Sequence, residues 1–254
     1  MRKITPYEQN LLLKNKISAS SVRDIGDMPL EYFIGKAEFR DRDFFVNKNV
    51  LIPRIESEQM LDLVLKNLSG QSLYNIIDIG AGSGAIGIST YLELQQQNLN
   101  VHLTIVDVSA TALEVAQKNV NVLIPLAELK NISLVLSDLF FVRSLQETRY
   151  DFILANLPYI PTDRIEGLDS SVKDYEPPLA LDGGKTGLDL IYLMLYEIRD
   201  YDLLTDDGKI ILEIDETHDV KDFAIFPNFA PELVKDEFGL NRFIVLKKVP
   251  KFSQ

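Results

Sequence analysis

The sequence predicts an α/β fold in which helices cover a doubly wound, mostly parallel sheet. Three observations predict it. Short apolar runs of strand length alternate with stretches of helix length through the middle of the chain, the order that a parallel sheet requires. A glycine-rich turn, DIGAGSGAIG at 78–87, joins the first apolar run to the first helix. The last two runs, ELVKDEF and NRFIVLKK, are joined too tightly for a parallel crossover, so one of them must run antiparallel.

The main part of the chain reads as follows, in order. Strands are expected at 74–80, 102–108, 132–138, 150–156 and 208–214, and then as a closing pair on either side of Gly239. Helices are expected at 85–97, from a cap at Ser109 to 122, at 187–204 and at 217–226. Apolar runs of strand length that end at glycine or a polar residue indicate buried strands.

The first 70 residues have a different pattern. They predict one or two short helices at 7–23, a hairpin at 32–52 and an amphipathic helix at 57–68. We therefore expect three parts: an N-terminal helical segment at 1–28, a hairpin with a linking helix at 29–70, and the main domain at 71–254.

Composition excludes several classes of protein. The 254-residue chain is 46% hydrophobic and 25% charged, as expected of a globular domain. No apolar run reaches about 18 residues, so no transmembrane helix is expected. There is no cysteine, which excludes disulfides and thiolate metal sites. The start, MRKITPYEQNLLLKNK, lacks the apolar core of a signal peptide, so the cytoplasm is the expected location.

The net charge of −12 argues against direct nucleic-acid binding. Proteins that hold nucleic acid neutralise phosphates with lysine and arginine. A basic protein partner suits this charge better.

The glycine loop predicts a site for a nucleoside-bearing cofactor. Gly80, Gly82 and Gly84 lie in a strand-to-helix turn, where the backbone can approach a ligand and the helix presents free N–H groups. Asp107 ends the next strand, where a carboxylate can accept both ribose hydroxyls. Two alternatives remain. One is a merely structural glycine turn; the other is a dinucleotide site, because Gly82, Gly84 and Gly87 also satisfy G-x-G-x-x-G with Asp107 about twenty residues further on.

Two more polar segments end strands of the same predicted sheet. In SDLF, the Asp138 carboxylate can accept from an adenine amino group and the Leu139 backbone N–H can meet a ring nitrogen; a helix cap is the alternative. In NLPY, Asn156 is followed by Leu157 and a proline. Ligands of doubly wound sheets bind at the carboxyl ends of the strands, where all of these segments lie.

In this order, DIGAGSG, Asp107, SDLF and NLPY resemble class I S-adenosylmethionine-dependent methyltransferases that modify an amide or aromatic amino nitrogen. Four longer stretches resemble the peptide chain release factor N5-glutamine methyltransferases: PLEYFIGKAEF, VLIPRIESE, EPPLALDGGKTGLDLI and KDEFGLNRF. The resemblance runs from about Pro29 to Lys248.

The resemblance implies a Rossmann-like sheet of seven strands at 71–254 and methylation of the glutamine in the Gly-Gly-Gln motif of release factors, a step of translation termination. It implies S-adenosyl-L-methionine as cofactor and the release factor as partner. The residues expected to bind the cofactor are Gly80, Ala81, Gly82, Ser83, Gly84, Asp107, Asp138, Leu139 and Asn156.

The catalytic and substrate-binding residues are expected in NLPY: Asn156, Leu157, Pro158 and Tyr159. The Asn156 side-chain oxygen and the Leu157 carbonyl would accept the two N–H groups of the substrate amide. Tyr159 would stack on the amide plane, and Pro158 would stiffen the loop. The family usually has N-P-P-Y. A residue before proline is held extended, so leucine can present the carbonyl much as proline would.

The second departure from the family is a reduced helical segment at 1–28, which bears on recognition of the partner. Three alternative functions remain. NLPY also resembles the ribosomal RNA adenine dimethyltransferases, ribosomal-protein glutamine methyltransferases share the motif, and a non-catalytic S-adenosylmethionine-binding module would keep the glycine loop.

Three other polar residues, Arg54, Glu56 and Glu176, each allow a functional and a structural interpretation. Arg54 and Glu56 either shape the cofactor or substrate mouth or form a structural salt bridge, and Glu176 either positions a loop over the site or only caps it. His102 and His218 read as ordinary surface or strand-edge residues. No His, Asp or Glu cluster has metal-ligand spacing.

Overall fold

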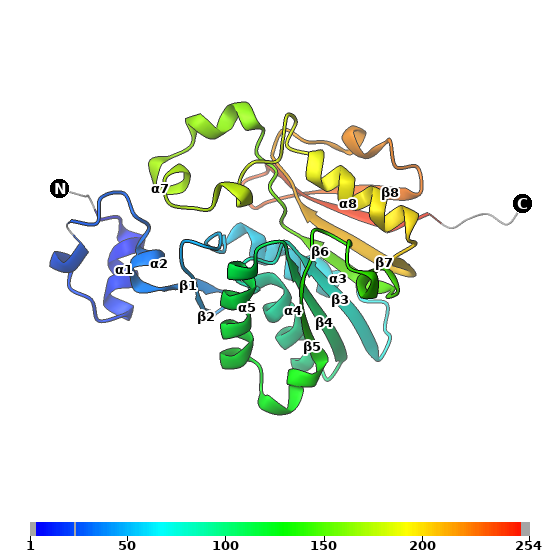
Figure 1. The fold of residues 1–254 in the computed structure, drawn as a ribbon, viewed down its shortest axis with the longest axis horizontal. Helices are drawn as coiled ribbons and strands as arrows, with labels where there is room; N and C mark the ends of the chain where they lie inside the picture. The colour runs from blue at the N-terminus through cyan, green and yellow to red at the C-terminus, as the bar shows by residue number, and fades with distance from the viewer. Residues whose placement is uncertain (1–3, 23, 250–254) are drawn as a thin grey trace, which may run out of the picture.

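A computed structural model describes residues 4–22 and 24–249. Its centre is a seven-stranded sheet in the order β5-β4-β3-β6-β7-β9-β8 (Figure 1). The strands are β3 (Leu73–Ile79), β4 (Asn100–Asp107), β5 (Ile132–Leu136), β6 (Tyr150–Ala155), β7 (Leu204–Glu213), β8 (Phe229–Lys235) and β9 (Asn241–Lys248). Strands β3 to β7 pair in parallel, whereas β9 is antiparallel to both β7 and β8. The predicted sheet and its antiparallel closing strand are confirmed.

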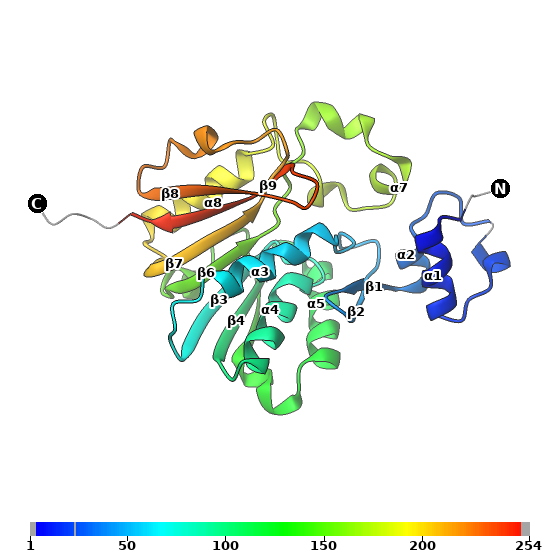
Figure 2. The ribbon, with the colours of Figure 1, turned by 180° about the vertical axis from the view of Figure 1, so that it is seen from behind.

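Helices cover both faces of this sheet (Figures 1 and 2). The α-helices of the main part are α3 (Gln59–Lys66), α4 (Ala85–Gln96), α5 (Ala110–Leu123), α6 (Arg143–Gln146), α7 (Ser170–Lys173) and α8 (Asp189–Asp200). Successive strand residues point to opposite faces. Ile76 packs with α3, α4 and α5, whereas Ile77 packs with α8, so the sheet separates two buried apolar clusters.

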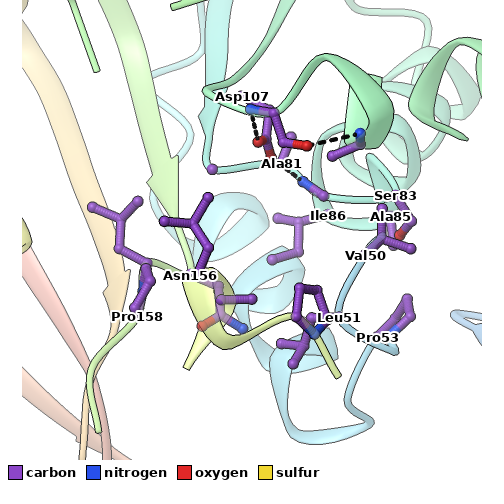
Figure 3. Close-up of a pocket in the computed structure, with 18 of the residues that line it drawn as sticks. Val50, Leu51, Pro53, Ala81, Ser83, Ala85, Ile86, Asp107, Asn156 and Pro158 are labelled. Carbon is purple, nitrogen blue, oxygen red and sulfur yellow. Dashed lines mark hydrogen bonds between the residues drawn. The ribbon is translucent and has the colours of Figure 1, made fainter. Parts of the chain in front are cut away.

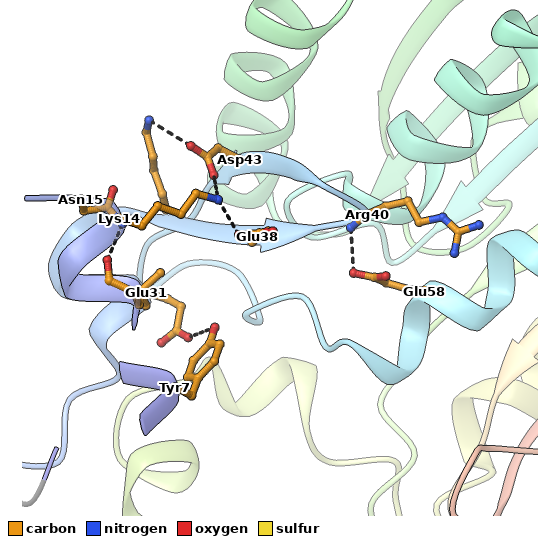
Figure 4. Close-up of polar contacts among 10 residues, drawn as sticks. Tyr7, Lys14, Asn15, Glu31, Glu38, Arg40, Asp43 and Glu58 are labelled. Carbon is orange, nitrogen blue, oxygen red and sulfur yellow. Dashed lines mark hydrogen bonds and ion pairs between the residues drawn. The ribbon is translucent and has the colours of Figure 1, made fainter. Parts of the chain in front are cut away.

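The N-terminal part contains α1 (Pro6–Lys14), α2 (Leu30–Ile34) and a hairpin of β1 (Lys36–Phe39) and β2 (Arg42–Phe45). Thr5 caps α1 in a capping box with Glu8. The first helices enclose a small apolar cluster of their own around Leu12 and Val22. Figure 4 shows Lys14 reaching from α1 to Glu38 and Asp43 of the hairpin. The division at 28 and 70 stays a prediction.

Single 3₁₀ turns complete the fold: η1 (Ala19–Val22), η2 (Glu56–Glu58), η3 (Leu126–Asn131), η4 (Thr162–Gly167), η5 (Pro178–Ala180) and η6 (Val220–Phe223). The strand expected at 208–214 begins earlier, at Leu204, and three other expected elements differ clearly in their bounds. The hairpin is shorter than 32–52 because α2 ends at Gly35, which adopts φ +77°. The helix expected at 187–204 stops at Asp200, since Leu204 already begins β7. The helix expected at 217–226 is only the turn η6.

Buried polar contacts fasten the hairpin to the main domain. Asn119 on α5 accepts from the Phe45 N–H at 2.7 Å and donates to the carbonyls of Phe45 and Ser83 at 3.0 and 2.9 Å. One buried amide therefore joins the hairpin, α5 and the glycine loop. Within 4–22 and 24–249, no helix is long and apolar enough to cross a membrane, and no group of acidic or histidine side chains is arranged to hold a metal ion.

Candidate active site

A cavity opens at the carboxyl ends of β3, β4 and β6 (Figure 3), and its empty space, open mouth included, is ≈ 970 Å³. The segment 49–57 lies on one side of it and 177–190 on another. The predicted residues that line it are Gly80, Ala81, Gly82, Ser83, Asp107, Asn156, Leu157 and Pro158, together with Arg54. The topology therefore brings the glycine loop, the acidic strand end and NLPY to one place, as expected for a doubly wound sheet.

The glycine loop has a backbone that only glycine adopts easily. Gly80, Gly82 and Gly84 have φ of +69°, +56° and +78°. The Gly82 N–H donates to Asp107 Oδ2 and the Ser109 N–H to Oδ1, each at 2.8 Å. The carboxylate of β4 thus holds the loop that follows β3.

Asp107 keeps acceptor capacity beyond these two bonds, because an ionised carboxylate has about four lone-pair sites. Its side chain borders the cavity, although the residue is only 8% exposed. Burial raises the pKa of the Asp107 carboxyl, and backbone N–H groups, Ser109 first, oppose this rise. A buried acceptor of this kind suits the paired hydroxyls of a ribose.

The residues of SDLF stand apart from the cavity walls. Asp138 is exposed, and its carbonyl accepts from the Phe141 N–H at 3.0 Å. Leu139 is buried in the apolar cluster below α8 and adopts φ +46°. Both follow the carboxyl end of β5, but neither they nor Gly84 and Tyr159 belong to the lining residues. Their assignment to the cofactor and the substrate stays a prediction.

Asn156 directly follows β6, and its amide is held at the nitrogen end. Asn156 Nδ2 donates to Ser57 Oγ at 3.1 Å and to Glu213 Oε2 at 3.0 Å. A carboxylate attracts an N–H and repels a carbonyl oxygen, so the amide must face Glu213 through its nitrogen. The oxygen end, Oδ1, is therefore turned away from Glu213 and is the end that remains for a ligand.

The next three residues of NLPY differ in exposure. Leu157 is 3% exposed and lies over Gly80, while Pro158 is half-buried at the cavity wall. Tyr159 is half-buried too. Its hydroxyl donates to Glu213 Oε1 at 2.9 Å. Burial, and then the charge of Glu213, raises the pKa of this hydroxyl, so it remains a donor.

Ser57 and Glu213 are the polar residues of this site that the sequence does not reveal. Glu213 ends β7 and is 1% exposed. Burial raises the pKa of its carboxyl, whereas the hydrogen bonds from Ser57 and Tyr159 act in the opposite direction. One feature of the sequence could have revealed Glu213: it is an acidic residue inside the apolar run KIILEI. Burying a carboxylate in a strand is costly, so such a residue indicates hydrogen-bond partners at that place.

Arg54, which lines the cavity, pairs with Glu176 at 2.6 Å between Nη2 and Oε2. The Glu176 side chain is buried, and burial raises the pKa of its carboxyl against the effect of Arg54. The structural salt bridge that the sequence left open thus joins Arg54 to Glu176 rather than to Glu56, which begins η2. It ties the 49–57 segment to the chain that enters η5.

The reading of His218 as a surface residue is wrong, whereas His102 is exposed as expected. His218 is 4% exposed, its Nδ1 accepts from the Asp215 N–H at 3.2 Å, and its Nε2 lies 2.9 Å from the Thr186 carbonyl. Because Nδ1 accepts, Nε2 carries the proton that Thr186 accepts. The ring fixes the 184–187 turn against the end of β7.

Comparison with known families gives consistent results. Residues 56–166 match the model of the methyltransferase small domain. The chain is 33% identical over 229 residues to the release factor glutamine methyltransferase of Bacillus anthracis, covering 87% of this chain and 77% of that protein. With the release factor glutamine methyltransferase of Lactococcus lactis it shares 36% identity over 249 residues, or 96% and 85% of the two chains.

Solved structures agree on the fold. A methyltransferase from Pyrococcus furiosus superposes with a TM-score of 0.55 at 17% identity, covering 96% of this chain and 100% of that one. A ribosomal protein L11 methylase from Lactobacillus delbrueckii gives 0.51 at 15% identity, covering 77% and 80%. At such identities the likeness shows a class I methyltransferase fold and nothing of the substrate.

The sequence relatives carry the assignment further, because each exceeds 30% identity over most of both chains. Of the four short segments that carry the resemblance, the glycine loop, the acidic end of β4 and NLPY meet at the cavity, whereas SDLF does not line it. The chain therefore belongs to the release factor glutamine methyltransferase family.

Proposed function

We propose that this protein transfers a methyl group from S-adenosyl-L-methionine to the side-chain amide nitrogen of a protein glutamine, the one in the Gly-Gly-Gln motif of a peptide chain release factor. The observation that carries the proposal is the orientation of Asn156. Its Nδ2 is held by Ser57 and Glu213, so its Oδ1 is the end available as an acceptor beside a cavity that also contains Asp107.

The residues of the cavity fit the cofactor. Asp107 offers buried carboxylate oxygens for the ribose hydroxyls, and Gly82, which has no side chain, lets a ligand approach the loop closely. Apolar residues such as Val50 and Ile86 line the rest of the space. We also assign Asp138 and Leu139 to the adenine. When bound, the cofactor supplies an activated methyl group on a sulfonium.

The protein's task is then to orient a poor nucleophile. A glutamine amide nitrogen is weakly nucleophilic because its lone pair is delocalised into the carbonyl. Asn156 Oδ1 and the Leu157 carbonyl accept its two hydrogens, which directs the lone pair toward the methyl group and favours the positive charge that develops on nitrogen. Since Leu157 precedes Pro158, its backbone is held extended and its carbonyl is fixed in place.

The release factor is the proposed partner, and the cytoplasm, where release factors act, is the proposed location. The net charge of −12 suits a basic protein surface better than a nucleic acid. Two other substrates with an amide or amino nitrogen remain as outcomes of the test, namely ribosomal proteins and the adenines of ribosomal RNA or DNA.

The test is a methyl-transfer assay with labelled S-adenosylmethionine and three substrates side by side: purified release factor, ribosomes and DNA. We expect label in the release factor alone, on the Gly-Gly-Gln peptide of a tryptic digest. A release factor with that glutamine replaced by alanine is the matched control and should take up no label. Label in ribosomes or DNA with none in the release factor would contradict the proposal.

A further inference from the structure

Three donors from distant segments converge on one buried carboxylate. Glu213, the last residue of β7, accepts from Ser57 Oγ at 2.5 Å and from Asn156 Nδ2 at 3.0 Å, both at Oε2. Its Oε1 accepts from the Tyr159 hydroxyl at 2.9 Å. The donors come from η2 and from the loop after β6, so Glu213 joins two sides of the site.

Each of these contacts has a direction. Ser57 Oγ accepts from Asn156 Nδ2 at 3.1 Å, so its own hydrogen is free to point at Glu213. The oxygens of Ser57 and Glu213 therefore present acceptors side by side to the amide nitrogen of Asn156. The bonds from Ser57 Oγ and from Asn156 Nδ2 both require an acceptor at Glu213 Oε2, and neither can form if that atom becomes a donor.

Burying a carboxylate costs free energy unless hydrogen bonds compensate, so hydrophobic burial alone does not explain why Glu213 lies inside the sheet. The neighbours of Glu213 in β7, Ile211 and Leu212, are fully buried and apolar. A leucine or isoleucine would pack there without this cost. The acidic side chain is instead matched to two residues that line the cavity, Ser57 and Asn156, and to Tyr159 of the same loop.

We propose that Glu213 is a positioning residue of the methyl-transfer site, which turns Asn156 Oδ1 toward the substrate amide and holds the Tyr159 ring through its hydroxyl. The proposal rests on the proposed function for its substrate, but the orientation of Asn156 can be measured without one. Glu213 itself does not line the cavity, so it would act on the substrate through Asn156 and Tyr159.

The decisive variant is Glu213→Gln, which keeps size and shape but replaces one acceptor oxygen by an NH₂ group. If this group faces Asn156, two NH₂ groups meet and Asn156 must turn its oxygen inward. If it faces Tyr159, the ring loses its acceptor. Misplacement of a reacting group by about 1 Å can cost about 10²-fold. We expect the single-turnover rate to fall by about that factor, with the KM for release factor and the affinity for S-adenosylhomocysteine changed less than about threefold.

The matched control is Asp215→Asn, a second buried carboxylate just beyond the end of β7 that binds Arg164 and Thr217 instead. It should lower the melting temperature while keeping the single-turnover rate. If both variants lose rate in proportion to their loss of melting temperature, Glu213 has only a structural role and the proposal is overturned.

A second readout does not depend on activity. The side-chain amide signals of Asn156, assigned by their loss in Asn156→Ala, should shift in the NMR spectrum of Glu213→Gln and stay in place in Asp215→Asn. Unchanged signals in both would overturn the proposal even if no substrate were known. Failure of the wild-type protein to methylate release factor, with the shift present, would instead overturn only the proposed function.

Should Glu213→Gln not fold, Tyr159→Phe carries the test, because it removes one contact of Glu213 and keeps the ring. We expect a fall of about tenfold in the single-turnover rate at unchanged affinity for S-adenosylhomocysteine. A rate equal to that of the wild type would show that the hydroxyl contact positions nothing.

Discussion

The side chain of Leu157 lies so close over Gly80 that a β-carbon on Gly80 would stand 2.8 Å from Leu157 Cδ2. The glycine loop, to which we assign cofactor contacts, and the NLPY loop, to which we assign substrate contacts, therefore touch where the Leu157 side chain lies against Gly80. A change at Gly80 or at Leu157 should therefore affect the position of both loops.

Gly80→Ala should destabilise the protein by about 1–3 kcal/mol, because alanine is strained at φ +69° and collides with Leu157. Chemical denaturation measures the change. The double variant with Leu157→Ala should lose less than the sum of the two single variants, since the collision is then removed. Strictly additive losses would show that the contact does not matter.

Leu157→Pro separates the carbonyl of this residue from its side chain. Proline keeps an extended backbone and presents the same carbonyl, so single-turnover transfer should stay within about tenfold of the wild type, or about 1.4 kcal/mol in activation free energy. Because Leu157 is 3% exposed, the variant should also lose some thermal stability. A well-folded but nearly inactive variant would assign the substrate contact to the leucine side chain instead.

Asn156→Ala removes the acceptor that nothing else in NLPY replaces. Turnover should fall by roughly 10²–10³, as it does on loss of one oxyanion-hole donor. Affinity for S-adenosylhomocysteine, measured by calorimetry, should change far less, since the glycine loop and Asp107 provide most of the expected contacts. An active Asn156→Ala beside an inactive Leu157→Pro would overturn the assignment of the whole motif.

Asp107 should govern the choice and affinity of the cofactor. The wild type should bind S-adenosylmethionine and S-adenosylhomocysteine in calorimetry and show no heat with NAD. Asp107→Ala loses hydrogen bonds to a charged acceptor, about 1.5–3 kcal/mol each before solvent compensation, and also releases the Gly82 N–H. Asp107→Asn, which keeps one acceptor oxygen, should lose less affinity. Equal affinity in all three proteins would remove Asp107 from the ribose site.

Asp78 should give the stability a measurable pH dependence. Burial raises the pKa of its carboxyl to about 7, against the bond from the Gly87 N–H. A pKa higher in the folded than in the unfolded chain means that the folded state binds the proton more tightly. Its contribution to stability is therefore complete below about pH 4 and is lost as pH rises through 7. Relative to Asp78→Asn, the wild type should become less stable over this range in urea denaturation. A relative gain would contradict the pKa.

The elements that depend on residues close together in the chain could be predicted from the sequence. The strands expected at 74–80 and 150–156 and the turn between β3 and α4 follow from local apolar runs and glycines, and the structure confirms them, with strand ends at Ile79 and Ala155. Glu213 could not be assigned in this way, because its partners lie 156, 57 and 54 positions away. The burial of His218 could not be predicted for the same reason, because its ring meets the Thr186 carbonyl, 32 positions away in the chain.

Asn119 binds both Phe45 of the hairpin and Ser83 of the glycine loop. A shortened protein should therefore need the hairpin in order to fold with an intact glycine loop. Cutting the chain after the hairpin would leave buried amide groups without partners beside that loop. The helix α1, by contrast, reaches the hairpin through exposed ion pairs of Lys14, which contribute little energy. Tyr32 of α2, however, donates to the Val50 carbonyl at 2.7 Å. Grafting experiments between relatives should therefore exchange the segment before α2 and leave α2, β1 and β2 with the catalytic domain.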